Sequence, residues 1–152
     1  MPAPFVIEEY VRWSDVDFAG IIFYGAYVRF FEIAETEMFR AAGLAYKNVF
    51  ERYGVFLPRR AIQAEFFTPA RLDDRLSVAA YIGRVGTKSM TINFEVVWGT
   101  PRKLGATGSQ VLVCVGRDDL RPRPIPPLLL EALTPFTLGV AAARAALGVS
   151  AP

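Results

Sequence analysis

The segment between Tyr24 and Gly43 constrains the fold of this chain more than any other part of the sequence. Plotted at about 100° per residue, its apolar side chains, such as Phe30 and Phe31, fall on one arc, and most of its charged residues fall on the other side. The glycine that ends the pattern is a natural helix stop. We therefore expect a helix of about five turns with one face that must be buried.

Extended segments surround this helix. One β-type segment precedes it, from Val6 to Trp13, and four follow it in series, after a short helical pattern from Tyr46 to Tyr53. The four later segments cover residues 55–72, 76–86, 89–99 and 104–118. Strands in series favour an antiparallel meander, and an apolar helix packs on one face of it. The sequence thus predicts an α+β hotdog fold, in which an antiparallel five-stranded sheet wraps around one long central helix.

The proline-rich residues 121–127 mark the end of the predicted sheet, because proline cannot donate to a strand ladder. We expect residues 1–121 to form the main domain, and residues 122–152 to form a proline-rich junction and a C-terminal helical tail packed on the same domain. Two segments of that tail, 128–136 and 138–148, have helical patterns. A second copy of the chain would cover the open sheet edge and the remaining apolar surface, giving a homodimer or homotetramer.

Residue types that are absent or rare in the chain limit the catalytic mechanisms and metal sites that it can form. The chain has no His, which excludes Ser-His-Asp catalysis, Cys-His catalysis and His-based metal sites, and we expect no metal. The single cysteine, Cys114, lies in an apolar run and is expected to be a core thiol in a reducing cytoplasm. Any catalysis must then use carboxylates, hydroxyls, Lys or backbone dipoles.

Hydropathy and charge indicate which classes of binding partner the chain can have. Hydrophobic residues make up 53% of the chain, but no run of about 18 uncharged apolar residues exists, so we expect no membrane span. The first residues lack the basic and then apolar pattern of a secretory signal. The net charge is only +2 and the Arg residues are scattered, which makes nucleic acid a poor partner. Scattered guanidinium groups suit a phosphate-bearing small molecule better.

Two carboxylates, Asp15 and Asp17, lie on a glycine-containing loop directly before the long helix. The first turn of a helix presents unpaired N–H groups and a partial positive charge. These donors can stabilise an oxyanion while a nearby carboxylate attacks a carbonyl or activates water. Acyl transfer is therefore feasible without His, although aspartates before helices also serve as caps or turn residues.

From about Tyr10 to Val115 the sequence resembles the 4-hydroxybenzoyl-CoA thioesterase family, including relatives of the Tol-Pal-associated acyl-CoA thioesterase type. The family pattern is an Asp, a variable residue, Ala-Gly, two aliphatic residues, an aromatic pair and a Tyr within the helix. Here it reads Asp17-Phe-Ala-Gly-Ile-Ile-Phe-Tyr24-Gly-Ala-Tyr27. A second block, Phe67 to Asp74, resembles the segment that ends a strand in the family, and its spacing from the first block fits.

The resemblance implies roles for several residues. Asp17 matches the nucleophile or general base, and Tyr24 stands where a backbone N–H at the helix start polarises the thioester carbonyl. Three further positions, Tyr27, Phe31 and Glu32, match residues near the acyl group. Gly25 also lies there, and it departs from the Pro or His often found at this position. In the Tol-Pal type a His usually stands in place of Tyr24, so this chain is more similar to the hydroxybenzoyl branch.

Two other segments are implied as binding regions. The first, Phe56, Leu57 and Pro58, aligns with a stretch that borders the acyl tunnel, although Phe56 and Leu57 could equally be core residues. The second lies in a hairpin turn and resembles the basic segment near the CoA phosphates; it comprises Arg84, Thr87, Lys88 and Ser89. An ordinary polar turn is an equally good interpretation of this segment.

Taken together, these features predict an acyl-CoA thioesterase that hydrolyses a CoA thioester, with an aromatic acyl group as one option. CoA is part of the substrate, and no separate cofactor is expected. Glu35 lies at the border of the apolar arc and is expected to pair with an Arg rather than to act in catalysis. A non-catalytic acyl-CoA-binding module is the main alternative, and a hotdog hydratase is less favoured without His.

Overall fold

The computed structural model describes all 152 residues, from Met1 to Pro152. Five strands form one antiparallel sheet in the order β1-β4-β5-β6-β3. Their bounds are Phe5–Tyr10 (β1), Arg59–Phe66 (β3), Arg75–Val85 (β4), Ser89–Trp98 (β5) and Lys103–Val113 (β6). Two short strands, Val55–Phe56 (β2) and Val115–Gly116 (β7), pair separately. The helices are Ala26–Ala41 (α1), Tyr46–Tyr53 (α2), Pro127–Leu133 (α3) and Val140–Leu147 (α4), and single 3-10 turns cover Trp13–Asp15 and Thr134–Phe136.

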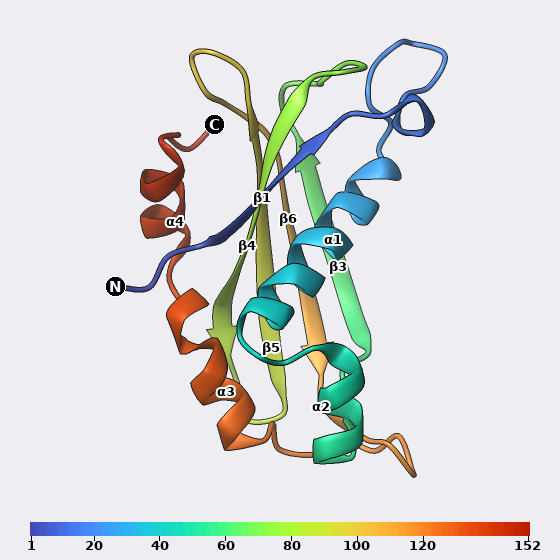
Figure 1. Cartoon of the computed structure of the whole chain (residues 1–152), viewed down its shortest axis with the longest axis vertical. Coiled ribbons are helices and arrows are strands. Elements are labelled where there is room, and N and C mark those ends of the chain that lie inside the picture. The colour runs from blue at the N-terminus through green and yellow to red at the C-terminus, as the bar shows by residue number, and fades with distance from the viewer.

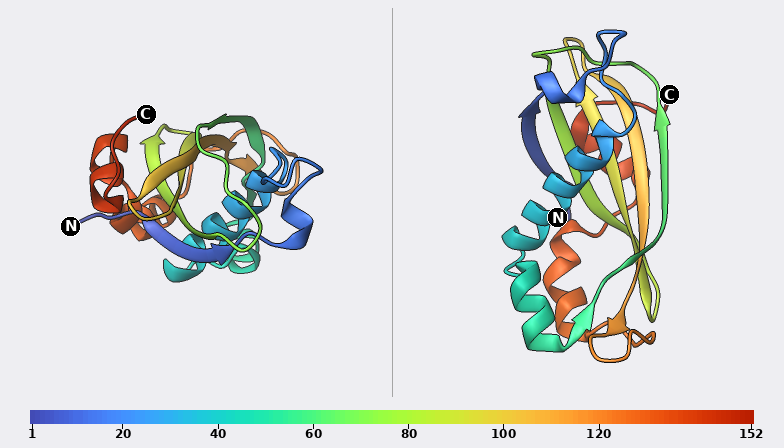
Figure 2. Two further views of the ribbon diagram at one scale, coloured as in Figure 1. Left: turned by 90° about the horizontal axis from the view of Figure 1, so that it is seen from above. Right: turned by 90° about the vertical axis from the view of Figure 1, so that its right-hand side faces the viewer.

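The predicted antiparallel five-stranded sheet is confirmed, and its strands show why these residues form it. Apolar and β-branched side chains alternate along β4 and β5, so that one face of the sheet receives residues such as Val78, Ile82 and Ile92. The expected hairpin between these two strands turns at Gly86–Lys88. The sheet curves around the helix that covers this face (Figures 1 and 2).

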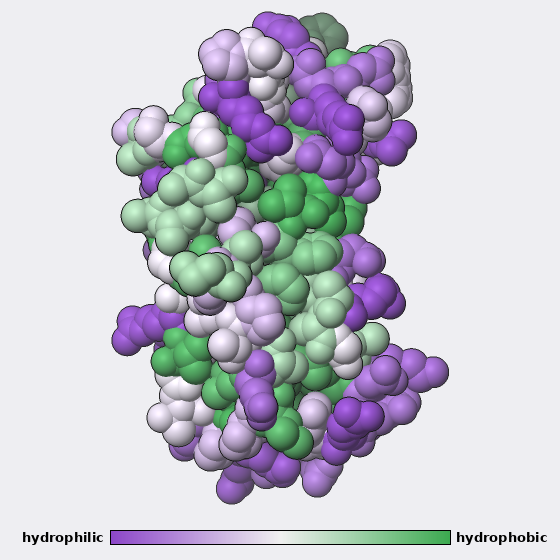
Figure 3. All heavy atoms as spheres, turned by 60° about the vertical axis from the view of Figure 1, so that its left-hand side comes forward, coloured by the Kyte–Doolittle hydropathy of each residue, from purple (hydrophilic) through white to green (hydrophobic).

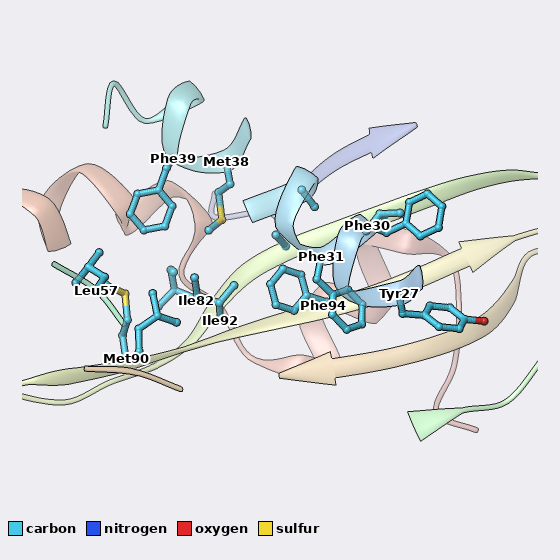
Figure 4. Packing of buried hydrophobic residues seen from close by; sticks show 14 of the residues in the cluster. Tyr27, Phe30, Phe31, Met38, Phe39, Leu57, Ile82, Met90, Ile92 and Phe94 are labelled. Carbon is cyan, nitrogen blue, oxygen red and sulfur yellow. The ribbon is translucent and has the colours of Figure 1, made fainter. Parts of the chain in front are cut away.

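Helix α1 packs its apolar arc against the sheet. Phe31 is fully buried, and its ring stacks on Phe94 of β5 with centroids 4.6 Å apart. Gly108 of β6 makes room for this contact, because a Cβ there would lie 2.5 Å from the Phe31 ring. Figure 4 shows Phe31 and Phe94 side by side in the middle of the core, with Tyr27 at one end and Leu57 at the other.

The core holds more than one helix, which differs from the expected single central helix. Helix α1 has 16 residues, and it begins after a turn in which the Ala26 N–H donates to the Phe23 carbonyl. Val49 of α2 and two leucines of α3, Leu129 and Leu133, belong to the same buried cluster. Their apolar faces were too short to indicate from the sequence that they share the core with α1.

The extended segment predicted for residues 55–72 is divided in the structure. Pro58 separates β2 from β3, since proline interrupts a strand ladder. Strand β3 then forms one edge of the sheet, and all eight of its residues are exposed. Among them Ile62 and Phe66 are large apolar side chains. The chain therefore has an open, partly apolar strand edge of the kind that pairs with another strand.

The C-terminal tail crosses to the other face of the sheet. Leu147 of α4 packs on Ala79, Val97 and Leu104, which point away from α1. Figure 3 views the side of the molecule that carries α3 and α4, where apolar residues gather in the middle between hydrophilic ends. No helix is both long and apolar enough to cross a membrane.

Candidate active site

Asp17 lies at the start of a tight turn that is closed by hydrogen bonds of its backbone and side chain. Its backbone N–H donates to the Ile21 carbonyl, and its Oδ1 accepts a hydrogen bond of 2.8 Å from the Ala19 N–H. Gly20 has φ of 78°, a left-handed conformation that glycine adopts without strain. This turn fixes one carboxylate oxygen and leaves the other, Oδ2, without a hydrogen-bond partner in the protein.

The buried Asp15 holds this loop in place. Its carboxylate accepts two hydrogen bonds of 2.7 Å from Nη2 of Arg29 on α1, one to each oxygen, and a third of 2.7 Å from the Arg12 N–H. The Phe23 N–H also donates to the Asp15 carbonyl. Asp15 is therefore a structural anchor between the loop and α1, whereas the exposed Asp17 has no ion pair.

The start of α1 presents free backbone donors near this loop. The N–H groups of Tyr24 and Gly25 have no acceptor in the protein, because the turn uses the N–H groups of Phe23 and Ala26 instead. Unpaired amides at a helix start carry the positive end of the helix dipole. The predicted position of Tyr24 at the helix entry therefore agrees with the geometry.

A surface pocket of about 340 Å³ joins Asp17 to this helix start. Seven of its nine lining residues are hydrophobic, and the full set is Asp17, Ile21, Ile22, Phe23, Tyr24, Tyr27, Phe66, Phe67 and Pro69. Tyr27 is buried, which raises the pKa of its hydroxyl above the ordinary value. Its ring packs on Phe66 with centroids 5.0 Å apart. The pocket thus pairs one carboxylate with an aromatic wall.

Gly25 has a steric role at this pocket. A Cβ at this position would lie 2.8 Å from Cε2 of Phe23, whose ring lines the pocket. The backbone at Gly25 has φ of −67°, which any residue can adopt. The glycine is therefore required for space rather than for its backbone angle.

Two residues predicted near the acyl group lie outside this pocket. Phe31 is fully buried in the core against Phe94. Glu32, the next residue of α1, is exposed and has no hydrogen bond in the protein. Of the residues implied by the resemblance, the pocket brings together Asp17, Tyr24 and Tyr27, and Gly25 adjoins it.

The second implied acyl-binding segment lies at the far end of the sheet from Asp17. Leu57 belongs to the core, and Phe56 packs edge-on against Phe50 of α2. Pro58, which is exposed, precedes β3, while Phe66 ends it. Eight residues of strand separate these two points, a distance of about 25 Å at 3.3 Å per residue. One chain therefore does not bring Pro58 to the Asp17 pocket.

The predicted CoA segment is also distant from Asp17 within one chain. Arg84 and Ser89 line a pocket of about 180 Å³ together with Arg60, at the end of the sheet where β4 turns into β5. Thr87 and Lys88 are exposed in that turn, and their carbonyls accept hydrogen bonds from neighbouring segments. In Figure 1 this turn lies at the bottom of the sheet, whereas the loop before α1 lies at the top.

Glu35 is buried in α1 and pairs with an arginine, as expected. Its Oε2 accepts a hydrogen bond of 2.6 Å from the Tyr46 hydroxyl and a salt bridge from Nη2 of Arg59. Burial raises the pKa of Glu35, against the opposing effects of Arg59 and Tyr46. Its second oxygen, Oε1, is buried and has no partner.

The sequence analysis assigned no role to some residues that line these pockets. Phe66 and Phe67 complete the aromatic wall; Phe67 begins the second block of the resemblance, which assigned it no role, and Phe66 directly precedes that block. Arg60 joins the basic pocket across two strands, which the linear spacing could not indicate. No three Cys, Asp or Glu side chains converge closely enough to hold a metal ion.

Comparison with known proteins shows to which family this chain belongs. Residues 11–133 match the profile of the thioesterase-like superfamily. The acyl-CoA thioester hydrolase YbgC of Escherichia coli is 28% identical over 116 residues, which cover 76% of this chain and 85% of that protein.

Solved structures share the fold. The 1,4-dihydroxy-2-naphthoyl-CoA thioesterase of Synechocystis has a TM-score of 0.78 at 22% identity, covering 86% of this chain and 95% of that one. A 4-hydroxybenzoyl-CoA thioesterase complexed with 4-hydroxybenzoyl-CoA also has a TM-score of 0.78, at 24% identity, covering 86% and 99% of the two chains. These similarities identify the hotdog arrangement of sheet and helix.

Proposed function

This chain belongs to the thioesterase-like superfamily, and on that premise we propose that it hydrolyses an acyl-CoA to the free acid and CoA. The observation that carries the proposal is the pocket in which the Asp17 carboxylate lies beside the start of α1, where two amides are free. The named relatives act on acyl-CoA thioesters, which agrees with this chemistry.

The free amides supply the electrophilic half of the reaction. The thioester carbonyl oxygen accepts hydrogen bonds from the N–H groups of Tyr24 and Gly25, which are preorganised for the negative charge that develops on it. Donors of this kind stabilise the tetrahedral intermediate more than the ground state, because the charge is larger there.

Asp17 supplies the other half, by one of two routes. As a nucleophile, its free Oδ2 attacks the thioester carbon, CoA leaves as the thiolate, and water then hydrolyses the acyl anhydride to regenerate the carboxylate. As a general base, Oδ2 takes a proton from water, the resulting hydroxide attacks the same carbon, and the proton passes to the departing thiolate. Both routes consume one water and release acid and CoA.

The acyl group that fits this pocket best is aromatic. Five aromatic side chains line the pocket: Phe23, Tyr24, Tyr27, Phe66 and Phe67. Planar rings pack favourably on such a wall. Solved relatives include thioesterases for 1,4-dihydroxy-2-naphthoyl-CoA and 4-hydroxybenzoyl-CoA, whose acyl groups are aromatic.

A second copy of this chain completes the site. The β3 edge is fully exposed, and antiparallel pairing of two such edges sets the first residues of one strand beside the last residues of the other. The partner's Pro58 then lies near Phe66, and the partner's Arg60 and Arg84 lie at the same end of the joined sheet as Asp17. This arrangement gives the CoA phosphates a basic pocket, for which guanidinium groups are suited. We place the enzyme in the cytoplasm, where the buried Cys114 would stay a free thiol.

A thiol-release assay with a panel of CoA thioesters tests the proposal. The panel contains benzoyl-, phenylacetyl-, short-chain and long-chain acyl-CoAs, and free CoA is followed with a thiol reagent. We expect hydrolysis of at least one member, with aromatic acyl groups preferred. Saturable binding of CoA without thiol release from any member would instead identify a non-catalytic acyl-CoA-binding module.

A further inference from the structure

The outer face of the sheet, which takes no part in the proposed hydrolysis, carries a second pocket. It has a volume of about 230 Å³, with Val140 and Arg144 of α4 on one side and residues of the edge strand β3 on the other. Only three of its eleven lining residues are hydrophobic, whereas seven of nine are hydrophobic in the Asp17 pocket. The two pockets therefore suit ligands of different chemistry.

The strand register explains why polar side chains gather in this pocket, because side chains of directly paired residues lie on the same face of a sheet. One row across four strands consists of Gln63, Ser109, Asn93 and Tyr81. The next row on the same face consists of Glu65, Thr107, Glu95 and Ala79. Ala79 packs on Leu147 of α4, which identifies this face as the outer one. Helix α4 thus covers the apolar part of the face and leaves the polar part open to the pocket.

Glu95 lines this pocket and is 1% exposed, but only one of its oxygens has partners. Oε1 accepts hydrogen bonds from the Tyr81 hydroxyl at 3.0 Å and from Nε of Arg144 at 3.2 Å. Oε2 is buried and has no donor in the protein. A buried carboxylate oxygen without a donor costs free energy, so a donor from outside the chain would stabilise this arrangement.

The charges in the pocket favour a cation. Its lining has two carboxylates, Glu65 and Glu95, and one guanidinium, that of Arg144. Nε and Nη2 of Arg144 already donate to Glu95 and Thr107. Burial, and then the neighbouring Glu95, raise the pKa of Tyr81, so its hydroxyl stays neutral. The pocket therefore has an excess of one negative charge, and the exposed Glu65 has no salt bridge in the protein.

We propose that this outer-face pocket binds a small primary ammonium compound. An ammonium group has three N–H donors and one positive charge, so it supplies the donor that Oε2 of Glu95 lacks and balances the excess charge beside Glu65. The amide oxygens of Gln63 and Asn93 and the Ser109 hydroxyl are further acceptors in the same pocket. The ligand is small, because pockets for drug-sized molecules have volumes of about 300–1,000 Å³.

An NMR titration with ethylammonium tests the proposal, with the side-chain amide signals of Gln63 and Asn93 as reporters. We expect saturable shifts of both signals, with a roughly millimolar Kd, since so small a ligand makes few contacts. Tetramethylammonium has the same charge without N–H donors, and ethanol has a donor without the charge. Both should bind at least about tenfold more weakly than ethylammonium, because each lacks one half of the interaction with Glu95.

Two variants assign the binding to the carboxylates. Glu95→Gln keeps the shape and the acceptor for Tyr81, but its free end becomes a donor, so the affinity for ethylammonium should fall at least about tenfold. Glu65→Gln changes an exposed residue, which does not put the fold at risk, and should lower the affinity by a few fold.

The chain offers a matched control for Glu95→Gln. Glu35 is also buried, also pairs with an arginine and a tyrosine hydroxyl, and also has one oxygen without a partner, but it lies in α1 on the inner face of the sheet. Glu35→Gln should therefore leave the affinity for ethylammonium unchanged. Thermal unfolding checks that both variants are folded, and Glu65→Gln and tetramethylammonium complete the test if Glu95→Gln is not.

Three results would each overturn the proposal. They are an absence of saturable shifts with ethylammonium, equal affinity for ethylammonium and tetramethylammonium, and unchanged affinity in both Glu95→Gln and Glu65→Gln. Oε2 of Glu95 would then be satisfied by a water molecule only. The pocket lies on the other face of the sheet from Asp17, so none of these results depends on thioester hydrolysis.

Discussion

Two aspartates that are separated by a single residue have opposite surroundings in this structure. Asp15 is buried, and both of its carboxylate oxygens accept hydrogen bonds, from Arg29 and from the Arg12 N–H. Asp17 is exposed, keeps one oxygen free and shares a pocket with the start of α1, where two amides are unpaired. The carboxylate of Asp15 has its oxygens occupied by donors, so in the proposed reaction Asp17 is the carboxylate that acts.

At Gly25 a single methyl group is expected to disturb this chemistry. Gly25→Ala places a Cβ within 2.8 Å of the Phe23 ring and forces it to move in the pocket. We expect kcat/KM to fall by about tenfold while the fold persists, because small misplacements of groups around a reacting carbonyl are costly. Steady-state kinetics and circular dichroism measure the two effects. Gly139→Ala is the control, since nothing lies within 4 Å of its added Cβ.

The pH dependence of stability reports on Glu35. Burial raises its pKa in the folded state, so the folded protein holds this proton more tightly than the unfolded chain does. The contribution of Glu35 is therefore full below the ordinary pKa of about 4.3 and is lost as pH rises through the raised value. Urea unfolding at pH 4 and pH 7.5 should show that the unmodified protein loses stability relative to Glu35→Gln. A relative gain at the higher pH would mean that Arg59 dominates and lowers the pKa.

Elements differ in how far the sequence predicts them. Helix α1 and the β4–β5 hairpin follow from local periodicity, because the apolar arc and the alternating strands are each continuous in the sequence. The position of α4 on the sheet cannot be predicted from local periodicity, since a helix of alanines packs equally well on many surfaces. It lies on the outer face because Arg144 reaches the buried Glu95, 49 residues earlier in the chain.

The ion pair between Arg144 of α4 and the buried Glu95 is expected to contribute substantially to stability. Arg144→Ala leaves the Glu95 carboxylate buried and without a cation, with Tyr81 as its remaining donor. We expect a loss of about 3 kcal/mol in the free energy of unfolding, since removal of one partner of a buried ion pair leaves an uncompensated charge. Chemical denaturation measures it. Arg40→Ala, which breaks the exposed pair with Glu37, should cost less than about 0.5 kcal/mol.

For the whole molecule, one chain brings together only part of the site that the resemblance implies. The resemblance pointed to three groups of residues, and the structure brings one of them, around Asp17, into a single pocket. The acyl-tunnel and CoA segments lie at the other end of the sheet, near Pro58 and Arg84. Sequence spacing could not reveal this separation, because the distance is set by the length of β3 and by its position at the sheet edge.

Disruption of the edge should therefore abolish both association and activity. Ile62 lies near the middle of β3 and is exposed, so Ile62→Glu would bring like charges together in the proposed pairing of two β3 edges. We expect sedimentation or light scattering to report a monomer, with loss of thioester hydrolysis. Val6→Glu on β1, the other edge of the sheet, is the control and should keep both. A monomer that retains full hydrolysis would contradict a shared site.

The most direct test of the account is thiol release by Asp17→Asn. The amide keeps the shape of the turn and its acceptor for the Ala19 N–H, but it cannot attack a thioester or deprotonate water. We predict a fall in kcat of at least about a thousandfold with substrate binding and thermal stability retained, and no fall for the exposed control Asp118→Asn. Turnover by Asp17→Asn within a few fold of the unmodified enzyme would contradict the account.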